Sequence, residues 1–238
     1  MKKYLCLSLL PLGAVQVDAA RAKNIILFLG DAGGVSTLNA ASIYGHDRPQ
    51  SLYIQQMKHV ALSDTASLNR WVTDSAAGMT AIVTGRKTNQ NMVSVLPAPE
   101  PGADLPKLKT ILEYAEERGL STGVVTNMAI WDATPAACYA HAFTRKMTGE
   151  IFQHLLKPRF GDGPEVVIGT DWKGVVEASA KLGFDAAEGL AAAKYHYYER
   201  PDAIPADATR VASIFDGGDY DPKPVLDNVL QILSRNRK

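Results

Sequence analysis

Short apolar runs alternate with stretches of helical spacing along most of this chain. The runs are unbroken, only a few residues long and bounded by turn residues, a pattern that predicts buried strands. They occupy residues 24–29, 59–62, 121–126, 165–168 and 209–215. Apolar residues recur with helical spacing in 35–44, 76–84, 106–118, 147–156, 175–182 and 224–233. This alternation predicts an α/β fold with a largely parallel central sheet and helices on both faces.

Glycine and proline residues mark several boundaries of these elements. Gly85 and Gly119 each follow a helical stretch, where glycine commonly ends a helix. Pro106 opens the stretch that Gly119 closes, and proline suits the first turn of a helix. Residues 96–105 are rich in proline and follow neither period, so we expect a surface loop there.

The first residues follow the order of a secretory signal peptide. A basic start at 1–3 precedes an apolar run at 4–17 and then the small residues Ala19, Ala20 and Ala22. A membrane anchor or a core helix is the alternative, but the run is shorter than the about 20 apolar residues of a membrane span. We therefore expect a signal peptide over 1–22 and a mature domain over 23–238. This predicts a secreted or periplasmic protein with no membrane contact after signal removal.

Charge and cysteine content exclude some classes of function. The formal net charge is zero and no basic tract stands out, which argues against a nucleic-acid-binding protein. Cys6 lies in the expected signal peptide, so Cys138 would remain alone and could form no internal disulfide. No His or Lys adjoins Cys138 in sequence to lower its pKa, so we expect a buried structural thiol there.

Active sites in open α/β sheets form at the carboxyl ends of the parallel strands. The residues that follow the apolar runs are therefore the first candidates for an active site. Gly30-Asp31-Ala32-Gly33-Gly34 follows the first run. Asp31 would project there as a carboxylate ligand for a divalent metal ion. The alternative is an ordinary turn in which the aspartate caps the next helix.

A serine at the start of a predicted helix follows the second apolar run, within Val72-Thr73-Asp74-Ser75-Ala76-Ala77-Gly78-Met79-Thr80. Unpaired N–H groups at a helix N-terminus favour anions such as phosphate. Ser75 is thus a candidate nucleophile for a phosphoryl group. The alternative is that Thr-Asp-Ser is only a capping sequence.

Trp131-Asp132-Ala133-Thr134-Pro135-Ala136-Ala137 follows the third apolar run and leads on to His141 and Arg145. Thr134 offers a hard oxygen to a cation. Arg145 offers a planar fork of donors that matches phosphate oxygens. Alternatively, Arg145 and the lysine after it belong to a solvated surface.

Together, the order and the residue sequences of these three stretches resemble those of the alkaline phosphatase family. The shared pattern is a strand ending in Gly-Asp-x-x-Gly, then Thr-Asp-Ser-Ala, then Asp-Ala-Thr-Pro-Ala-Ala with His and Arg downstream; it spans about Lys23 to Lys238. The resemblance implies metal-dependent hydrolysis of phosphate monoesters through a phosphoserine intermediate, with zinc and magnesium as cofactors. Members commonly form homodimers, so a homodimer is one assembly to test.

The resemblance also implies roles for metal-binding residues of this chain. Asp31 would bridge one zinc ion and the magnesium site, and Ser75 would be a ligand of the same zinc ion. Thr134 would be a magnesium ligand. Asp132 would lie beside the magnesium site without binding the ion directly.

For phosphate, the resemblance implies that Ser75 is the nucleophile that becomes phosphoserine. Arg145 would hold the phosphate, oriented by an ion pair with Asp74. His141 matches a family position without an assigned role.

The family completes its metal sites in its C-terminal half, with a glutamate, an Asp-x-x-x-His pair, an Asp-His dipeptide and a late histidine. Neither pair occurs here: the histidines are His46, His59, His141, His154 and His196, and no aspartate stands four residues before any of them. We therefore expect a truncated N-terminal part of the catalytic domain, with a sheet incomplete at its C-terminal side and activity left open. Ala32 also differs from the commoner family motif Gly-Asp-Gly-Met-Gly. This difference predicts a changed backbone path, with Asp31 retained.

Three interpretations remain open at this point. The first is a phosphomonoesterase that needs the missing part. The second is a non-catalytic truncated phosphatase that binds phosphate or a partner. The third is a related metallo-hydrolase such as a sulfatase or a phosphodiesterase. An incomplete parallel sheet would also expose a strand edge, which predicts association or poor solubility.

Overall fold

A computed structural model describes residues 22–102, 105–217 and 220–235. The predicted signal peptide falls on residues that lie, except for the last, outside this described part, so the peptide and the secreted or periplasmic location stay predictions. The chain divides into two units, 1–56 and 57–238. None of the described helices is long and apolar enough to cross a membrane.

The described residues of the first unit, 22–56, form one α-helix and one short 3-10 helix, α1 (Val35–His46) and η1 (Tyr53–Gln56). The backbone of Asp47 turns left-handed and its N–H donates to the Ile43 carbonyl at 2.8 Å, which ends α1. Ser42 is fully buried, and its hydroxyl is satisfied there because it donates to the Arg48 carbonyl and accepts from the N–H of Ser51, each at 2.8 Å. The helix predicted over 35–44 is confirmed.

Two predicted strands are wrong. Residues 24–29 and 59–62 form no strand, and their side chains are exposed: Ile25 and Phe28 by 74% and Leu62 fully. A strand exists only where a neighbouring strand takes up its N–H and C=O groups. Within the described residues, no strand pairs with either run, so apolar character alone does not make them strands.

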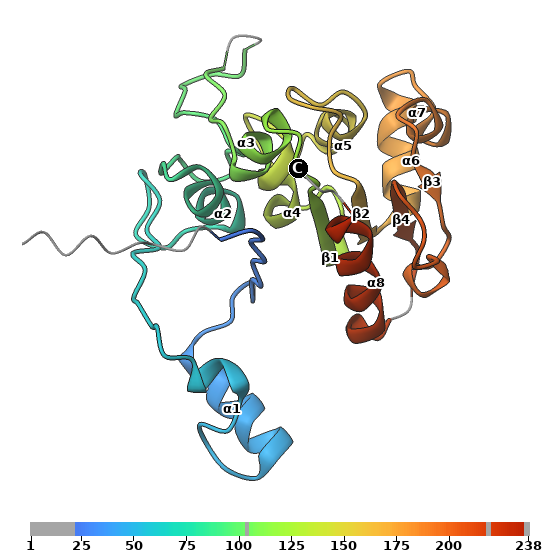
Figure 1. Cartoon of the computed structure of the whole chain (residues 1–238). Coiled ribbons are helices and arrows are strands. Elements are labelled where there is room, and N and C mark those ends of the chain that lie inside the picture. Colours follow the sequence, from blue (N-terminus) through green and yellow to red (C-terminus); the bar gives the residue numbers. More distant parts are fainter. Residues whose placement is uncertain (1–21, 103–104, 218–219, 236–238) are drawn as a thin grey trace, which may run out of the picture. The chain divides into compact units, whose positions relative to one another are not determined.

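The second unit is built on a four-stranded parallel sheet with the order β1-β2-β4-β3, visible in Figure 1. Its strands are β1 (Gly123–Ala129), β2 (Val166–Thr170), β3 (His196–Tyr197) and β4 (Val211–Phe215). The predicted strands at 121–126, 165–168 and 209–215 are confirmed, and β3 was missed. In the described part of the chain β1 pairs with β2 alone, so its other edge has no partner there. Association through that edge, and a homodimer, stay predictions.

Helices cover both faces of this sheet, as predicted. Val124, Val167, Ala212 and Ile214 belong to the larger apolar cluster. It is completed by helices on one side: α2 (Ser75–Thr84), α4 (Ala133–Tyr139), α5 (Thr148–Leu156), α6 (Trp172–Lys181) and α7 (Ala186–Ala192). The alternate strand residues, such as Val166 and Ile168, face α8 (Pro222–Ser234) on the other side.

The helix predicted from Pro106 begins later, as α3 (Ile111–Glu117). Thr110 and Glu113 form a capping box, in which each side chain accepts from the other residue's backbone N–H. The Pro106 carbonyl instead accepts from the N–H of Leu96 at 2.9 Å, within an antiparallel contact between the two segments. Pro106 therefore precedes the helix, and the sequence signal of its true start is Thr-Ile-Leu-Glu.

Cys138 packs against the larger apolar cluster, and burial raises the pKa of its thiol to about 12. A thiol with so high a pKa is almost entirely un-ionised at neutral pH and is therefore a poor nucleophile. Cys138 is half-buried against this cluster, which agrees with the expectation of a structural thiol.

Gly149 allows α5 to pack closely against α6. A Cβ on Gly149 would lie 2.9 Å from the Ala178 carbonyl oxygen and 2.7 Å from Leu182 Cδ1. We expect Gly149→Ala to lower the free energy of unfolding by about 1–3 kcal/mol, because a backbone oxygen cannot move aside as a side chain can. Glycine to alanine in a helix otherwise gains about 1 kcal/mol. Urea unfolding measures the difference.

Gly189 in α7 is the matched control, since its nearest contacts are all atoms of the flexible Leu156 side chain. Gly189→Ala is expected to cost less than Gly149→Ala. Equal effects of the two substitutions would contradict the close packing of α5 and α6 as the cause.

Candidate active site

Ser75 is the first residue of α2, and its side chain is half-buried. Asp74 occupies the N-cap with an extended backbone, and its carboxylate accepts from the N–H of Ala77 at 3.2 Å. The small residues that follow Ser75 are buried against the core, which holds this end of the helix in place. The Ser75 hydroxyl thus lies in the first turn of a helix, where backbone N–H groups favour a bound anion.

Asp132 repeats this arrangement at the start of α4. It follows the end of β1, its N–H donates to the Ala129 carbonyl, and its Oδ1 accepts from the N–H of Ala133 at 2.7 Å. Thr134 is the second residue of α4 and is half-buried. Two N-terminal helix turns, each with a capping aspartate, therefore carry four of the predicted site residues.

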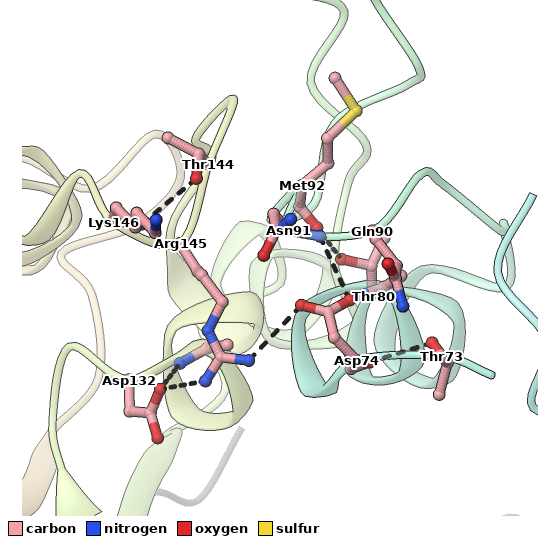
Figure 2. A network of polar contacts seen from close by, with 12 residues as sticks. Thr73, Asp74, Thr80, Gln90, Asn91, Met92, Asp132, Thr144, Arg145 and Lys146 are labelled. Carbon is pink, nitrogen blue, oxygen red and sulfur yellow. Dashed lines mark hydrogen bonds and ion pairs between the residues drawn. The ribbon is translucent and has the colours of Figure 1, made fainter. Parts of the chain in front are cut away.

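Arg145 joins the two N-caps. Its Nη1 lies 3.4 Å from Asp74 Oδ2, and its Nη2 lies 2.5 Å from Asp132 Oδ1, as Figure 2 shows. The three side chains retain between 18% and 26% exposure, so solvent still reaches this network. The pair with Asp74 was expected from the family resemblance. The pair with Asp132 was not predicted.

Backbone groups missed by the sequence reasoning also support this network. The N–H of Asn91 donates to Asp74 Oδ1 (Figure 2). The Asn91 carbonyl accepts from the N–H of Arg145. The sequence signal that could have drawn attention to Asn91 is its type, since asparagine is enriched at left-handed backbone positions.

Asp31 belongs to the first unit. It lies in a turn closed by a 3.0 Å hydrogen bond from the N–H of Gly33 to the Gly30 carbonyl. Ala32 in this turn has a φ of 55°, in the left-handed region that glycine adopts more readily. Ala32, which differs from the family motif, therefore has a left-handed backbone conformation that is unfavourable for alanine. Asp31 is retained at the position directly before Ala32, as in the family motif.

His141 lies in a separate, buried cluster. Its Nδ1 is 2.7 Å from the Ser94 carbonyl oxygen, and its Nε2 is 2.9 Å from Glu113 Oε1. Arg159 Nη1 lies 3.3 Å from the same carboxylate oxygen. Burial raises the pKa of Glu113, but its hydrogen bond to His141 and the nearby charges of His141 and Arg159 outweigh burial and bring the pKa below its usual value. His141 thus connects α3 to the chain around Ser94.

The metal ligands implied by the resemblance stay predictions. Thr134 offers a hard oxygen atom, a donor type that suits magnesium, and Asp132 stands two residues before it. Among the residues that the structure describes, no three or more His, Cys, Asp or Glu side chains are grouped so as to hold a metal ion. Zinc in a catalytic site takes about three protein ligands, so the described residues do not fit a zinc site.

A family model described as alkaline phosphatase matches residues 22–159, a range that contains every predicted site residue. The human tissue-nonspecific alkaline phosphatase is 40% identical over 134 residues, which cover 52% of this chain and 26% of the human protein. Streptomycin-6-phosphate phosphatase of Streptomyces griseus is 36% identical over 135 residues, covering 55% of this chain and 29% of that protein. The aligned part of the chain thus spans about a quarter of these relatives' length.

Solved structures show the same fold. The alkaline phosphatase of the Antarctic bacterium TAB5 superposes with a TM-score of 0.68 at 23% identity, covering 87% of this chain and 59% of that chain. That of Thermus thermophilus has a TM-score of 0.69 at 24% identity, covering 84% and 44%. A TAB5 variant was solved with Mg bound in the site named M3. Because the family model covers more than half of the chain and the fold agrees, this chain belongs to the alkaline phosphatase family.

Proposed function

We propose that this chain acts in the hydrolysis of phosphate monoesters, with Ser75 as the nucleophile and Arg145 as the phosphate-binding residue. The observation that supports this most strongly is the position of Arg145 between the N-cap carboxylates of α2 and α4, directly beside the residue that precedes Ser75. The relatives named above are phosphatases, which favours phosphate monoesters over phosphate diesters and sulfate esters.

The proposed reaction has two steps. In the first, Ser75 Oγ attacks phosphorus and loses its hydroxyl proton to solvent, the bond from phosphorus to the ester oxygen breaks, and the departing alkoxide takes up a proton from solvent. In the second, water attacks the phosphoserine, releasing inorganic phosphate and restoring the hydroxyl. An in-line attack at phosphorus needs positioning and charge stabilisation more than covalent help from other side chains.

Arg145 would provide that stabilisation. Its ion pairs engage Nη1 and Nη2, and each of these nitrogens carries a second N–H that can donate to a phosphate oxygen. The two carboxylates hold the planar guanidinium in one orientation, so less side-chain entropy is lost when phosphate binds. The N-terminal turn of α2 adds its backbone N–H groups.

By family resemblance, magnesium would be held beside this network by the hydroxyl oxygen of Thr134, with Asp132 next to the site but not bound to the ion. A bound metal ion lowers the pKa of a coordinated hydroxyl or water and stabilises a departing alkoxide. Zinc and the bridging role of Asp31 stay part of the proposal by family resemblance, and no step above depends on them.

A second candidate function is phosphate binding without turnover. It is favoured by the lack of a metal-binding group of His, Cys, Asp or Glu side chains within the described part of the chain. In this case Arg145 and the α2 N-terminus would bind phosphate, and Ser75 would not become phosphorylated.

Hydrolysis of p-nitrophenyl phosphate in the presence of zinc and magnesium separates these candidates. We expect Ser75→Ala to lower the rate at least about a thousandfold, because no other hydroxyl would replace the nucleophile. Thr84→Ala is the matched control, since it removes a hydroxyl from the last residue of the same helix. Equal rates for the wild-type protein and Ser75→Ala would exclude catalysis by Ser75, and bis-p-nitrophenyl phosphate and p-nitrophenyl sulfate test the other ester classes.

A further inference from the structure

A tight turn at residues 89–92 lies against the Asp74–Arg145 pair. The N–H of Met92 donates to the Asn89 carbonyl at 3.2 Å, which closes the turn. Asn91 holds its third position with a φ of 67°. A turn of this kind needs a left-handed residue at that position, and glycine or asparagine satisfies the need at least cost.

Both backbone groups of Asn91 contact the phosphate-binding pair. Its N–H donates to Asp74 Oδ1 at 3.2 Å (Figure 2). Its carbonyl accepts from the N–H of Arg145 at 2.7 Å. Asp74 Oδ2 is the oxygen that lies 3.4 Å from Arg145 Nη1. The backbone of Asn91 thus holds the Asp74 carboxylate and the Arg145 backbone close together, although Asp74 and Arg145 are 71 positions apart in sequence.

The turn is itself fixed on two sides. The N–H of Gln90 donates to Asn69 Oδ1 at 2.9 Å, and Gln90 Nε2 donates to the Val72 carbonyl at 2.8 Å, which connects the turn to the chain before Ser75. On the other side, Val93 and Ala142 exchange two backbone hydrogen bonds of 2.9 and 3.0 Å. These contacts hold the residues on both sides of Asn91 in place, and Asn91 itself contacts the ion pair of Asp74 and Arg145.

We propose that Asn91 is a positioning residue whose left-handed backbone aligns Arg145 for phosphate, a claim that rests on the proposed function of Arg145. A β-branched residue at this position would favour a negative φ. The change would turn the peptide groups on either side of residue 91 away from Asp74 and Arg145. The aligned arrangement would then be populated for only a fraction of the time, and the apparent affinity for phosphate would fall by that fraction.

Isothermal titration with inorganic phosphate, on the full chain, tests this. We expect Asn91→Val to weaken phosphate binding about tenfold and Asn91→Gly to leave it unchanged, because only valine strongly disfavours a left-handed backbone. Lys194→Val is the matched control: Lys194 is also exposed in the second unit and has a φ of 64°. It is expected to cost similar stability in thermal unfolding without changing phosphate affinity.

Two results would overturn the proposal. One is equal phosphate affinity for Asn91→Val and the wild-type protein. The other is equal weakening by Asn91→Val and Lys194→Val, which would mean that lost stability alone lowers the affinity.

Amide hydrogen exchange separates this proposal from the proposed function. The Arg145 N–H should be protected in the wild-type protein, Asn91→Gly and Lys194→Val, because it donates to the Asn91 carbonyl. Its protection should be lost in Asn91→Val, and retention there would overturn the positioning role. If the wild-type protein binds no phosphate, the proposed function fails, while the exchange result still decides the role of Asn91.

Discussion

Replacing Arg145 by alanine is expected to weaken the binding of inorganic phosphate by about a hundredfold, the loss typical of removing one partner from a hydrogen-bonded charge pair. The substitution also leaves the Asp74 and Asp132 carboxylates, now without their shared cation, beside the place where the phosphate would bind. Their repulsion adds to the loss of the two donors. Isothermal titration with phosphate measures the effect directly.

Two further variants sharpen this test. Arg145→Lys keeps the charge but loses the planar fork, so we expect an affinity between those of the wild-type protein and Arg145→Ala. Arg159→Ala is the matched control, because Arg159 also pairs with a carboxylate and its side chain is 29% exposed against 26% for Arg145. A loss of phosphate affinity in Arg159→Ala as large as in Arg145→Ala would contradict a specific role for Arg145.

Acidification is expected to destabilise the fold through His154 by about 3 kcal/mol between pH 6.5 and pH 4. Burial, together with the charges of His141 and Lys107, lowers the pKa of His154 from 6.5 to about 4, against the opposing effects of the His141 carbonyl and Glu113. The folded protein thus disfavours protonated His154, whereas the unfolded chain accepts the proton below pH 6.5. Stability from this group is therefore complete above pH 6.5 and is lost as the pH falls towards 4.

Urea unfolding at pH 7 and pH 4.5 measures this effect. His154→Gln retains an N–H that can donate to the His141 carbonyl, the partner of His154 Nε2 at 3.1 Å, but has no proton to gain. It should therefore show a smaller stability loss between the two pH values than the wild-type protein. His196→Gln, which changes an exposed histidine, should keep the wild-type loss. An unchanged pH dependence in His154→Gln would contradict the assignment.

Other carboxyl groups with shifted pKa values modify this pH dependence in opposite directions. The pKa of Glu113 is lowered, so its contribution is present above its unfolded pKa and is lost as the pH falls through the folded value. Burial raises the pKa of Glu116 and Glu165, so their contribution is present below the unfolded pKa and is lost as the pH rises. The comparison of His154→Gln with the wild-type protein cancels both effects.

Local sequence patterns predicted those parts of the fold that depend on local interactions. The strands β1, β2 and β4 and the helices α1, α2 and α5 follow from unbroken apolar runs and helical spacing. The runs at 24–29 and 59–62 have the same local character, yet they form no strand, because strand formation depends on a partner that the run itself does not specify. The helix α3 begins at the capping box of Thr110 and Glu113, later than Pro106 alone indicates.

The candidate site was predictable only in part for a similar reason. Asp74, Ser75 and Asp132 stand at helix starts, which local sequence reveals, and the family wording suggested Arg145 as their partner. That Asp132 shares this guanidinium depends on how α2 and α4 pack together. The contribution of Asn91 comes from its backbone groups and its left-handed φ, which residue types indicate only weakly.

The central claim, that Ser75 accepts a phosphoryl group beside Arg145, is tested most directly by mass spectrometry of peptides from the chain. The protein would be incubated with a phosphate monoester, zinc and magnesium, and quenched with acid. We predict phosphoserine at position 75 in the wild-type protein and at no other residue, with none in Ser75→Ala. Unmodified Ser75 in a sample that still releases phosphate, or no phosphoserine at all with metals present, would contradict the claim.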